Sequence, residues 1–372
     1  MLTLSGIRPY FRWSVRAIRA CVVLGLLISA TTLHADDQIT NLRGDTIDRS
    51  TIDGALKELV VSGAVPGVAL AVVSADGAIY QNTVGFANSA TQEPLRHDSV
   101  FEAASLSKPV FAYYVIRLAE KGIIELDKPL FDYLPHPGFV PEDLEAAKTI
   151  TARMVLSHTT GMPNWARGEP ISLSGQPGRV FSYSGEAFQF LTAAIGTHQG
   201  LGWGQELGAQ MDEVVFAPLK MSHSSFLWND TLAERKVYGH KDGEPTDKQS
   251  IGNGKSVGGA YSLHSTIGDY ARFVQALIKR EGLSDDTWRD ILAAHIQLPD
   301  DHEGRDMGQF AWSLGLAIKQ TDSGNRYVHT GNNHDFQTYM EFDPVAGIGL
   351  VYFTNSSEGA KVYDSLSQVM GL

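Results

Sequence analysis

The stretch FEAASLSKPVFAYYV, Phe101 to Val115, brings a serine and a lysine together at the start of an apolar segment. Residues i and i+3 share one face of a helix, so the ammonium group of Lys108 lies within reach of the Ser105 hydroxyl if this segment is helical. A serine beside a lysine is either an activated nucleophile or an ordinary helix start, because serine caps helices and lysine is a common surface residue. The rest of the chain has to decide between these two interpretations.

The composition of the chain is that of a globular protein, apart from its first 35 residues. The chain has 372 residues, of which 43% are hydrophobic and 19% charged, which excludes disordered and fibrous classes. Residues 1–35 carry four arginines and no acid, then the apolar run ACVVLGLLISA and the exit TTLHA. An apolar core of about 11 residues is shorter than the roughly 20 that span a bilayer. We therefore expect a secretory signal peptide at residues 1–35, a folded domain at residues 36–372, and export to the bacterial periplasm or beyond without a stable membrane span.

Charge and cysteine content exclude several classes of partner and site. Without the leader the chain has 26 basic and 42 acidic residues, a net charge of −16, so nucleic acid and anionic membrane surfaces are not expected partners. The single cysteine, Cys21, lies in the leader, which excludes a disulfide, a thiolate nucleophile or a Cys-ligated metal in the mature chain. The sequence has no H-E-x-x-H motif, and HEGRD at His302 lacks a second histidine, so we expect no metal site. The oligomeric state is left open.

Strand-like segments at both ends of the chain enclose a helical middle. Residues 65–88, VPGVALAVVSADGAIYQNTVGFAN, hold two apolar segments around Asp76-Gly77, a strong hairpin signal. FAWSLGLAIKQ, RYVHTG, QTYMEFD and GIGLVYFT form a second β-rich block within residues 310–354. Between these blocks, VFAYYVIRLAEKG, FQFLTAAIG and TIGDYARFVQALIKREG have helical periodicity. This order predicts a two-lobed α/β (α+β) fold: an antiparallel sheet from N- and C-terminal segments, flanked by helices, with an inserted helical lobe.

Two further motifs accompany the serine and lysine. FSYSGEAFQFL places Tyr183 in a turn before a helical pattern, and RYVHTGNNHDF places His329-Thr330-Gly331 at the end of a strand. Together with Ser105 and Lys108, a tyrosine on the helical lobe and an edge-strand basic-Thr-Gly run resemble the motifs of the penicillin-binding protein and serine β-lactamase superfamily. Longer segments, such as ITARMVLSHTTGMPNW and SVGGAYSLHSTIGDYARFV, extend the resemblance over about residues 50–358. They are similar to the class C-like branch, which includes β-lactamases, D-amino-acid-specific peptidases and carboxylesterases.

The resemblance implies a β-lactamase/transpeptidase-like fold and a role for each motif residue. Ser105 would attack a carbonyl group and form an acyl-enzyme, which water hydrolyses without a cofactor. Lys108 would be the base, with its pKa lowered by about three units from about 10.4, or it would stay charged and stabilise a Tyr183 phenolate. The resemblance also implies that the backbone N–H groups of Ser105 and Asn332 hold the oxyanion.

The chain departs from the class C pattern at two positions that bear on the substrate. The third residue of the family's Tyr-x-Asn motif is Gly185, so the amide that contacts an acylamino group is absent. The family's Lys-Thr-Gly is His329-Thr330-Gly331, which replaces a permanent cation by an imidazole of pKa near 6.5 and weakens the grip on a carboxylate. We therefore expect a small ester or amide as the substrate, and the alternative is a class C-type β-lactamase or D-Ala-type peptidase that acts on β-lactams or cell-wall peptides.

Structural interpretations of the same residues stay open at this stage. Ser105 and Lys108 alone fit a helix cap, and Tyr183 fits a packed aromatic residue with a satisfied hydroxyl group. His329 also fits a strand histidine bonded to the backbone. We expect His158, in LSHTTG, to be structural and to belong to a hydrogen-bonded turn.

Two functional alternatives compete with a Ser105 hydrolase. GKSVG, residues 254–258, matches the G-x-S-x-G nucleophile elbow around Ser256, but polar, turn-rich residues precede it and the next helical pattern begins only near Thr266. The non-enzymatic alternative is a penicillin- or peptidoglycan-binding sensor that is acylated once at Ser105 and does not turn over. The first alternative differs from a Ser105 hydrolase in the serine that is needed. The second differs in the number of catalytic cycles.

Overall fold

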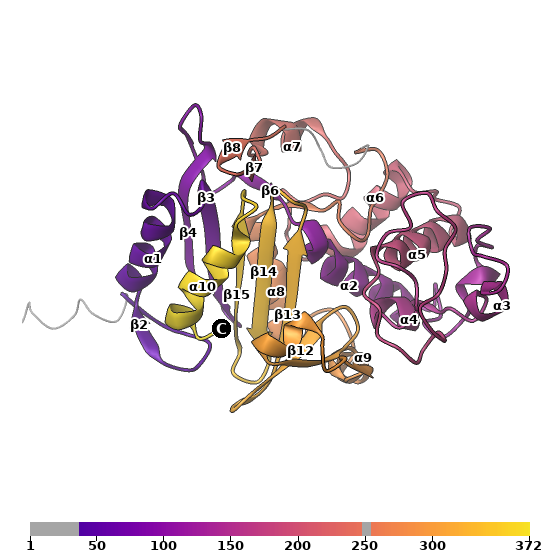
Figure 1. The fold of residues 1–372 in the computed structure, drawn as a ribbon. Helices are drawn as coiled ribbons and strands as arrows, with labels where there is room; N and C mark the ends of the chain where they lie inside the picture. Colours follow the sequence, from indigo (N-terminus) through magenta and orange to yellow (C-terminus); the bar gives the residue numbers. More distant parts are fainter. Residues whose placement is uncertain (1–36, 248–253) are drawn as a thin grey trace, which may run out of the picture. The chain divides into compact units, whose positions relative to one another are not determined.

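A nine-stranded antiparallel sheet organises the fold. The computed structural model describes residues 37–247 and 254–372, and the predicted leader, residues 1–35, lies outside the described residues. The strand order is β10-β11-β12-β13-β14-β15-β3-β4-β5 (Figure 1). The strands are β3 (Gly67–Ser74), β4 (Gly77–Asn88), β5 (Glu93–Pro94), β10 (Ile296–Gln297), β11 (Gln309–Trp312), β12 (Ala317–Thr321), β13 (Gly324–Asn332), β14 (Gln337–Asp343) and β15 (Ile348–Thr354).

The N-terminal and C-terminal blocks of strands meet where β15 pairs with β3. The predicted hairpin turns at Asp76-Gly77, with Ser74 opposite Gly77, and β15 runs antiparallel to β3 along its whole length. Alternate residues of β3 enter two different apolar clusters, because successive side chains of a strand point to opposite faces. The central strands are therefore buried on both faces, and the predicted antiparallel sheet built from both ends of the chain is confirmed.

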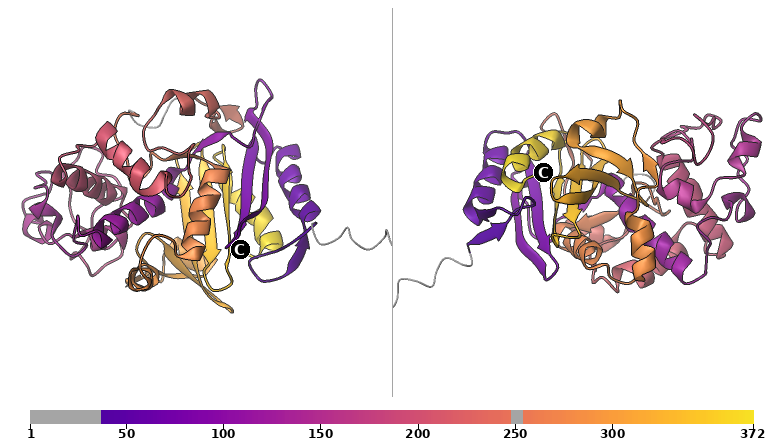
Figure 2. Two further views of the ribbon diagram at one scale, coloured as in Figure 1. Left: turned by 180° about the vertical axis from the view of Figure 1, so that it is seen from behind. Right: turned by 90° about the horizontal axis from the view of Figure 1, so that it is seen from below.

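Helices cover both faces of this sheet. Helices α1 (Arg49–Val61) and α10 (Gly359–Met370) pack on one face, where Leu56 and Leu366 lie in one cluster with Leu70 of β3. Helix α8 (Ile267–Lys279) packs on the opposite face, and the view from behind in Figure 2 shows it crossing the sheet. The strongly amphipathic pattern of α8 accounts for its place, since its apolar residues are buried while Arg272 and Lys279 are exposed.

The remaining helices form the predicted inserted lobe between β6 and β9. Its core contains Phe111 and Phe188, whose ring centroids are 6.1 Å apart and which join two of its helices. Figure 1 shows the lobe beside the sheet, at the end where β13 terminates. Its elements are η1 (Ala104–Leu106), α2 (Ser107–Glu120), η2 (Leu130–Asp132), α3 (Leu144–Ala147), α4 (Ala152–Leu156), α5 (Gly185–His198), α6 (Gln205–Met211), the π-helical turn η3 (Asp212–Phe216) and α7 (Asp230–Arg235).

The remaining elements of the described chain are short. Strand β6 pairs with β9 and leads directly into the turn that carries Ser105, while the 3₁₀ turn η4 precedes β11. These elements are β1 (Gln38–Thr40), β2 (Thr46–Asp48), β6 (Val100–Glu102), β7 (His240–Lys241), β8 (Glu244–Pro245), β9 (His264–Thr266), α9 (Asp285–Leu292) and η4 (Glu303–Met307).

One expectation about the sheet is wrong. The sequence motif suggested that His329-Thr330-Gly331 stands on an edge strand, but β13 lies inside the sheet between β12 and β14. The reason is that β10, β11 and β12 extend the sheet beyond β13, so the motif reaches the surface through the end of its strand.

Candidate active site

Ser105 and Lys108 lie together where the 3₁₀ turn η1 passes into helix α2. The Lys108 Nζ donates to the Ser105 Oγ at 3.0 Å and to the carbonyl oxygen of Ala260 at 3.0 Å. Lys108 is only 1% exposed and is surrounded by the core of the helical lobe, whereas Ser105 is half-buried. Hence the i, i+3 spacing of the sequence becomes a direct contact between a hydroxyl group and a buried amine.

The backbone before the serine is held in a turn that few residues adopt. Ala104 has φ of 50°, in the left-handed region that is unfavourable for residues other than glycine. Ser107 compensates, because its hydroxyl donates to the Ala104 carbonyl at 2.6 Å and accepts from the Leu263 N–H at 3.0 Å. The Tyr270 hydroxyl donates to the Leu106 carbonyl at 2.8 Å. These buried bonds fix the turn and thereby the direction of the Ser105 side chain.

Tyr183 approaches the same serine from the segment before α5. Its hydroxyl group forms a side-chain hydrogen bond with Ser105, and the Lys108 Nζ lies 4.7 Å from the centroid of its ring. The His158 ring packs on the Tyr183 ring with centroids 4.3 Å apart, and its Nδ1 accepts from the Ser184 N–H at 3.0 Å. His158 thus has the structural place that the sequence suggested, and it positions the segment that carries Tyr183.

The end of β13 forms the opposite wall of the site. His329 is buried, and its Nδ1 lies 2.7 Å from the Thr330 carbonyl oxygen, which can only accept, so Nδ1 carries the proton. The neutral ring consequently has its lone pair on Nε2, which finds no hydrogen-bond partner among the described residues. Gly331 lies against the serine turn so closely that a Cβ there would be 2.9 Å from the Ser105 N and 2.8 Å from the Ala103 carbonyl oxygen. Only glycine lets β13 approach the turn that carries Ser105 this closely.

Burial changes the acid–base properties of every titratable group in this cluster. Desolvation lowers the pKa of Lys108 to about 7, because the charged ammonium form has little contact with solvent. Desolvation raises the pKa of Tyr183 above its usual value, although the hydrogen bond from Ser105 opposes the change. Burial, with Lys108 nearby, lowers the pKa of His329 to about 3 and that of His158 well below its usual value. At neutral pH the cluster therefore holds a readily deprotonated amine among neutral rings.

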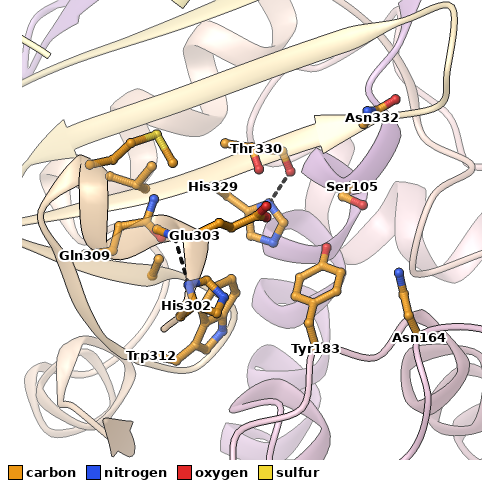
Figure 3. Close-up of a pocket in the computed structure, with 14 residues that line it drawn as sticks. Ser105, Asn164, Tyr183, His302, Glu303, Gln309, Trp312, His329, Thr330 and Asn332 are labelled. Carbon is orange, nitrogen blue, oxygen red and sulfur yellow. Dashed lines mark hydrogen bonds between the residues drawn. The ribbon is translucent and has the colours of Figure 1, made fainter. Parts of the chain in front are cut away.

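A cavity of about 410 Å³ opens in front of Ser105 (Figure 3). The structure brings Ser105, Tyr183, His329, Thr330 and Asn332 together around it, as the motifs implied. Lys108 lies behind Ser105, and Gly331 and Gly185 support the walls without lining the cavity. The other lining residues are Asn164, His302, Glu303, Gly304, Met307, Gln309, Trp312, Ala317 and Val328.

Two neighbours fill the place that an asparagine would take in a Tyr-x-Asn motif. A Cβ on Gly185 would come within 2.6 Å of the Trp165 ring, so Trp165 occupies the space next to this position. Asn164 accepts from the Gly185 N–H through its Oδ1 at 3.0 Å, and Figure 3 shows its amide nitrogen directed toward Ser105. A side-chain amide thus faces the cavity from a different segment. The sequence analysis missed this residue, and its place just after LSHTTGMP is the one local signal that could have found it.

The competing sites are not assembled by the described residues. Around Ser256 the chain forms bends and turns, the nearest described strand before it is β8, and the next helix, α8, begins only at Ile267, so the strand–turn–helix elbow is absent from residues 254–267. Within residues 37–247 and 254–372, no group of three or more His, Cys, Asp or Glu side chains is placed to hold a metal ion. In the same part of the chain, no helix has the length and apolar character needed to cross a membrane.

Comparisons with known proteins agree with this geometry. The chain is 26% identical to penicillin-binding protein 4 of Amycolatopsis lactamdurans over 328 residues, covering 81% of this chain and 84% of that protein. It is 28% identical to the esterase EstB of Burkholderia gladioli over 222 residues, covering 53% of this chain and 54% of that protein. The octameric penicillin-binding protein homologue from Pyrococcus abyssi has a similar fold, with a TM-score of 0.73 at 18% identity, covering 87% of this chain and 78% of that one.

A match to the family as a whole covers the folded part of the chain. The sequence model of the family described as Beta-lactamase matches residues 52–370, which include Ser105, Tyr183 and the end of β13. Relatives in this family are serine hydrolases with different substrates. The protein is therefore a serine hydrolase that belongs to the Beta-lactamase family, within the serine β-lactamase and penicillin-binding protein superfamily.

Proposed function

We propose that this serine hydrolase cleaves small esters through an acyl-enzyme on Ser105. The observation that carries the proposal is the contact of 3.0 Å between the Ser105 Oγ and a buried lysine whose pKa lies at about 7. An amine of that pKa is half deprotonated near neutrality and can accept the serine proton. The cavity in front of the serine has room for a small acyl or alcohol group.

Each covalent step can be assigned to groups in the site. The Ser105 Oγ bonds to the ester carbonyl carbon while its proton moves to the Lys108 Nζ, and the backbone N–H groups of Ser105 and Asn332 stabilise the oxyanion. The carbon–oxygen bond to the alcohol then breaks, and the lysine proton passes to the leaving oxygen. A water molecule repeats the sequence on the acyl-enzyme and releases the carboxylic acid and free Ser105. The net reaction is ester plus water to acid plus alcohol.

The acid–base balance favours Lys108 over Tyr183 as the proton acceptor. Desolvation lowers the pKa of the lysine and raises that of the tyrosine, so both groups are neutral in the resting site above about pH 7. A Tyr183 phenolate would need the opposite shifts. Tyr183 then acts as a hydrogen-bonding partner of the Ser105 hydroxyl and relays the proton toward the leaving group.

Two features favour an ester over a β-lactam or a D-alanyl peptide. Trp165 fills the space next to Gly185, where an asparagine would contact an acylamino group, and His329 is a neutral ring rather than a cation. A substrate carboxylate thus meets no positive charge at the end of β13. The resemblance to the esterase EstB supports the same choice, whereas the resemblance to a penicillin-binding protein keeps β-lactams as the alternative.

The decisive experiment compares two substrates and two serine variants. Hydrolysis of a p-nitrophenyl short-chain ester and of a chromogenic cephalosporin is measured with the wild type, Ser105→Ala and the control variant Ser256→Ala. We expect ester turnover in the wild type, little cephalosporin cleavage, loss of turnover by at least about 1,000-fold in Ser105→Ala, and near-normal activity in Ser256→Ala. Circular dichroism establishes that each variant is folded, and intact-protein mass spectrometry detects any stable acyl adduct.

Each contrary result has a definite meaning. Fast cephalosporin turnover with slow ester hydrolysis would replace the ester proposal by β-lactam or cell-wall peptide chemistry. A stable adduct on Ser105 without repeated cycles would indicate a sensor. Loss of activity in Ser256→Ala with an active Ser105→Ala would overturn the assignment of the nucleophile.

A further inference from the structure

The wall of the cavity opposite Ser105 has an unusual balance of charge. Among the described residues that line the cavity, Glu303 is the only acidic, lysine or arginine side chain. It belongs to the 3₁₀ turn η4 and is exposed to solvent. In Figure 3 its carboxylate extends from η4 into the cavity, toward His329 and the side where Ser105 lies. A single negative charge therefore faces the space that a substrate must enter.

Glu303 has no cation of its own within the described part of the chain. Its side chain forms no ion pair or hydrogen bond with the described residues. The Lys108 amine is buried behind Ser105 and donates hydrogen bonds to the Ser105 Oγ and to the Ala260 carbonyl oxygen. The carboxylate is consequently available to a group that comes from outside the protein.

His329 adds a second acceptor to the same wall. Since its Nδ1 proton is given to the Thr330 carbonyl oxygen, the ring presents a lone pair on Nε2, and this atom is buried without a partner. The corresponding residue in the family's Lys-Thr-Gly motif is a cation that donates. At this position of β13 the chain therefore has a hydrogen-bond acceptor where the family motif has a cationic donor. Like the Glu303 carboxylate, this acceptor favours a positively charged group.

Aromatic rings complete the lining on this side. The Trp312 ring lies 5.6 Å from His329 and 5.9 Å from Tyr183, measured between ring centroids and in near-perpendicular arrangements. Trp312 and Tyr183 both line the cavity. The faces of such rings attract ammonium groups, and the attraction grows when the cation is shielded from water.

We propose that the cavity selects esters that carry an ammonium group, and that Glu303 is the counter-ion for this group. The inference rests on the proposed ester hydrolysis and names its substrate class. The Glu303 carboxylate and the His329 lone pair favour a positive charge and disfavour a substrate carboxylate, and the Trp312 ring that lines the cavity adds to the attraction. Glu303 is a specificity-determining residue in this scheme, while Ser105 and Lys108 perform the chemistry.

The test uses pairs of substrates that differ only in charge. Choline butyrate is compared with its carbon isostere 3,3-dimethylbutyl butyrate, which places the charge on the alcohol side. The p-nitrophenyl esters of 4-(trimethylammonio)butanoate and of 5,5-dimethylhexanoate place it on the acyl side. The measured quantity is the ratio of kcat/KM for the cationic member to kcat/KM for the neutral member. We expect a ratio of about ten or more in one of the two pairs for the wild type.

Three variants assign the preference to one side chain. Glu303→Gln should lower the ratio about tenfold, and Glu303→Lys should bring it below one, because the sign of the local charge is reversed. Asp306→Asn is the matched control, since Asp306 is an exposed acid on the same 3₁₀ turn that does not line the cavity. This control should keep the wild-type ratio. Raising the salt concentration should lower the ratio in the wild type and leave it unchanged in Glu303→Gln.

The outcomes separate this inference from the proposed function. Equal rates for both members of both pairs, or a ratio that Glu303→Gln does not change, would overturn the inference and leave ester hydrolysis intact. Failure to hydrolyse any ester would overturn the proposed function. In that case calorimetric binding of choline against 3,3-dimethylbutan-1-ol still reads the site: choline binding that Glu303→Gln abolishes supports the inference, and equal binding of the two alcohols overturns it.

Discussion

At the scale of single residues, the proposed role of Lys108 predicts that the activity depends on pH in a defined direction. The lysine must be neutral to accept the Ser105 proton, and its pKa is lowered by burial to about 7. Activity should therefore rise as the pH increases through about 7 and level off above that value. Replacing Lys108 by arginine, which stays charged, should lower kcat/KM by about 100- to 10,000-fold at every pH. The measurement is a kcat/KM profile between pH 5 and 11.

The same experiment can reject the role of Lys108. A profile that is flat between pH 5 and 9, or a Lys108→Arg variant with the activity of the wild type, would show that another group accepts the proton. A profile that rises only near pH 10 would instead indicate a tyrosine, because the usual pKa of tyrosine is about 10 and burial raises that of Tyr183 further. Thermal unfolding of the variant serves as the control for folding.

Sequence reasoning could find the residues of the site that belong to a motif. It could not find those whose place depends on contacts between distant segments. Ser105 and Lys108 stand three positions apart on one helix face, so local periodicity was enough to predict their contact. Glu303 on η4 and Gln309 on β11 line the same cavity as Ser105, which lies far away in the sequence, so their place depends on contacts between distant parts of the chain. HEGRD, residues 302–306, lacks the second histidine of a metal motif, and nothing local indicates that Glu303 lines the same cavity as Ser105.

At the scale of elements, the beginning of helix α5 depends on a missing side chain. Replacing a glycine by alanine in a helix usually stabilises it by about 0.5–1 kcal/mol, but a Cβ on Gly185 would lie 2.6 Å from the Trp165 ring. Gly185→Ala should therefore destabilise the protein by about 1–3 kcal/mol through overpacking. In a Trp165→Ala background the same change should become stabilising. The measurement is a double-mutant cycle of urea unfolding.

The overpacking explanation predicts that the effect of Gly185→Ala on stability changes sign when Trp165 is replaced by alanine. If Gly185→Ala has the same effect with and without Trp165, the two residues do not interact and the tight contact is not the reason for the glycine. A coupling free energy of at least about 0.5 kcal/mol is expected for residues in contact. The control is Gly54→Ala in the middle of α1, where a Cβ would meet nothing within 4 Å and the substitution should stabilise in both backgrounds.

Elements with strong local signals were predicted well, and their neighbours in the sheet were not. The Asp76-Gly77 hairpin and the helices later seen as α2, α5 and α8 follow from turn chemistry and periodicity. The interior place of β13 could not be deduced in the same way. Periodicity marks FAWSLGLAIKQ and RYVHTG as strands but does not give the order in which strands pair, and β12, which begins within the first segment, pairs with β13 and covers the edge on which the motif was expected.

At the scale of the whole described fold, the order of the central strands follows from the distribution of apolar segments along the chain. Strand-rich blocks at both ends and helices between them leave few ways to bury the apolar faces, and pairing of β15 with β3 is one that closes the sheet. The polar contacts that hold the ends of this arrangement are less predictable. Some of them join residues far apart in the sequence, such as Leu42 and Arg326, and single charged residues give no local sign of such partners.

Arg326 is the clearest example and allows the last prediction. Its guanidinium is 3% exposed and donates to the Leu42 carbonyl at 2.7 Å, to the Gly371 carbonyl at 2.8 Å and to the Glu341 carboxylate at 3.0 Å. One side chain of β13 thus ties the segment before α1 and the residue after α10 to the sheet. Arg326→Met would leave the Glu341 carboxylate with the Tyr339 hydroxyl group and with Lys319 at 3.5 Å, and it would remove the guanidinium donor from two carbonyl groups.

Removing one partner of a buried ion pair typically costs about 3–5 kcal/mol, so Arg326→Met should lower the free energy of unfolding by that amount in urea titrations. Arg289→Met provides the control, because the Arg289–Asp286 pair is largely exposed and should contribute at most about 1 kcal/mol. Near-equal losses in the two variants would mean that burial does not strengthen the Arg326 contacts. A second variant, Arg326→Met with Glu341→Leu, should recover part of the loss, because it also removes the buried carboxylate that has lost its closest cation.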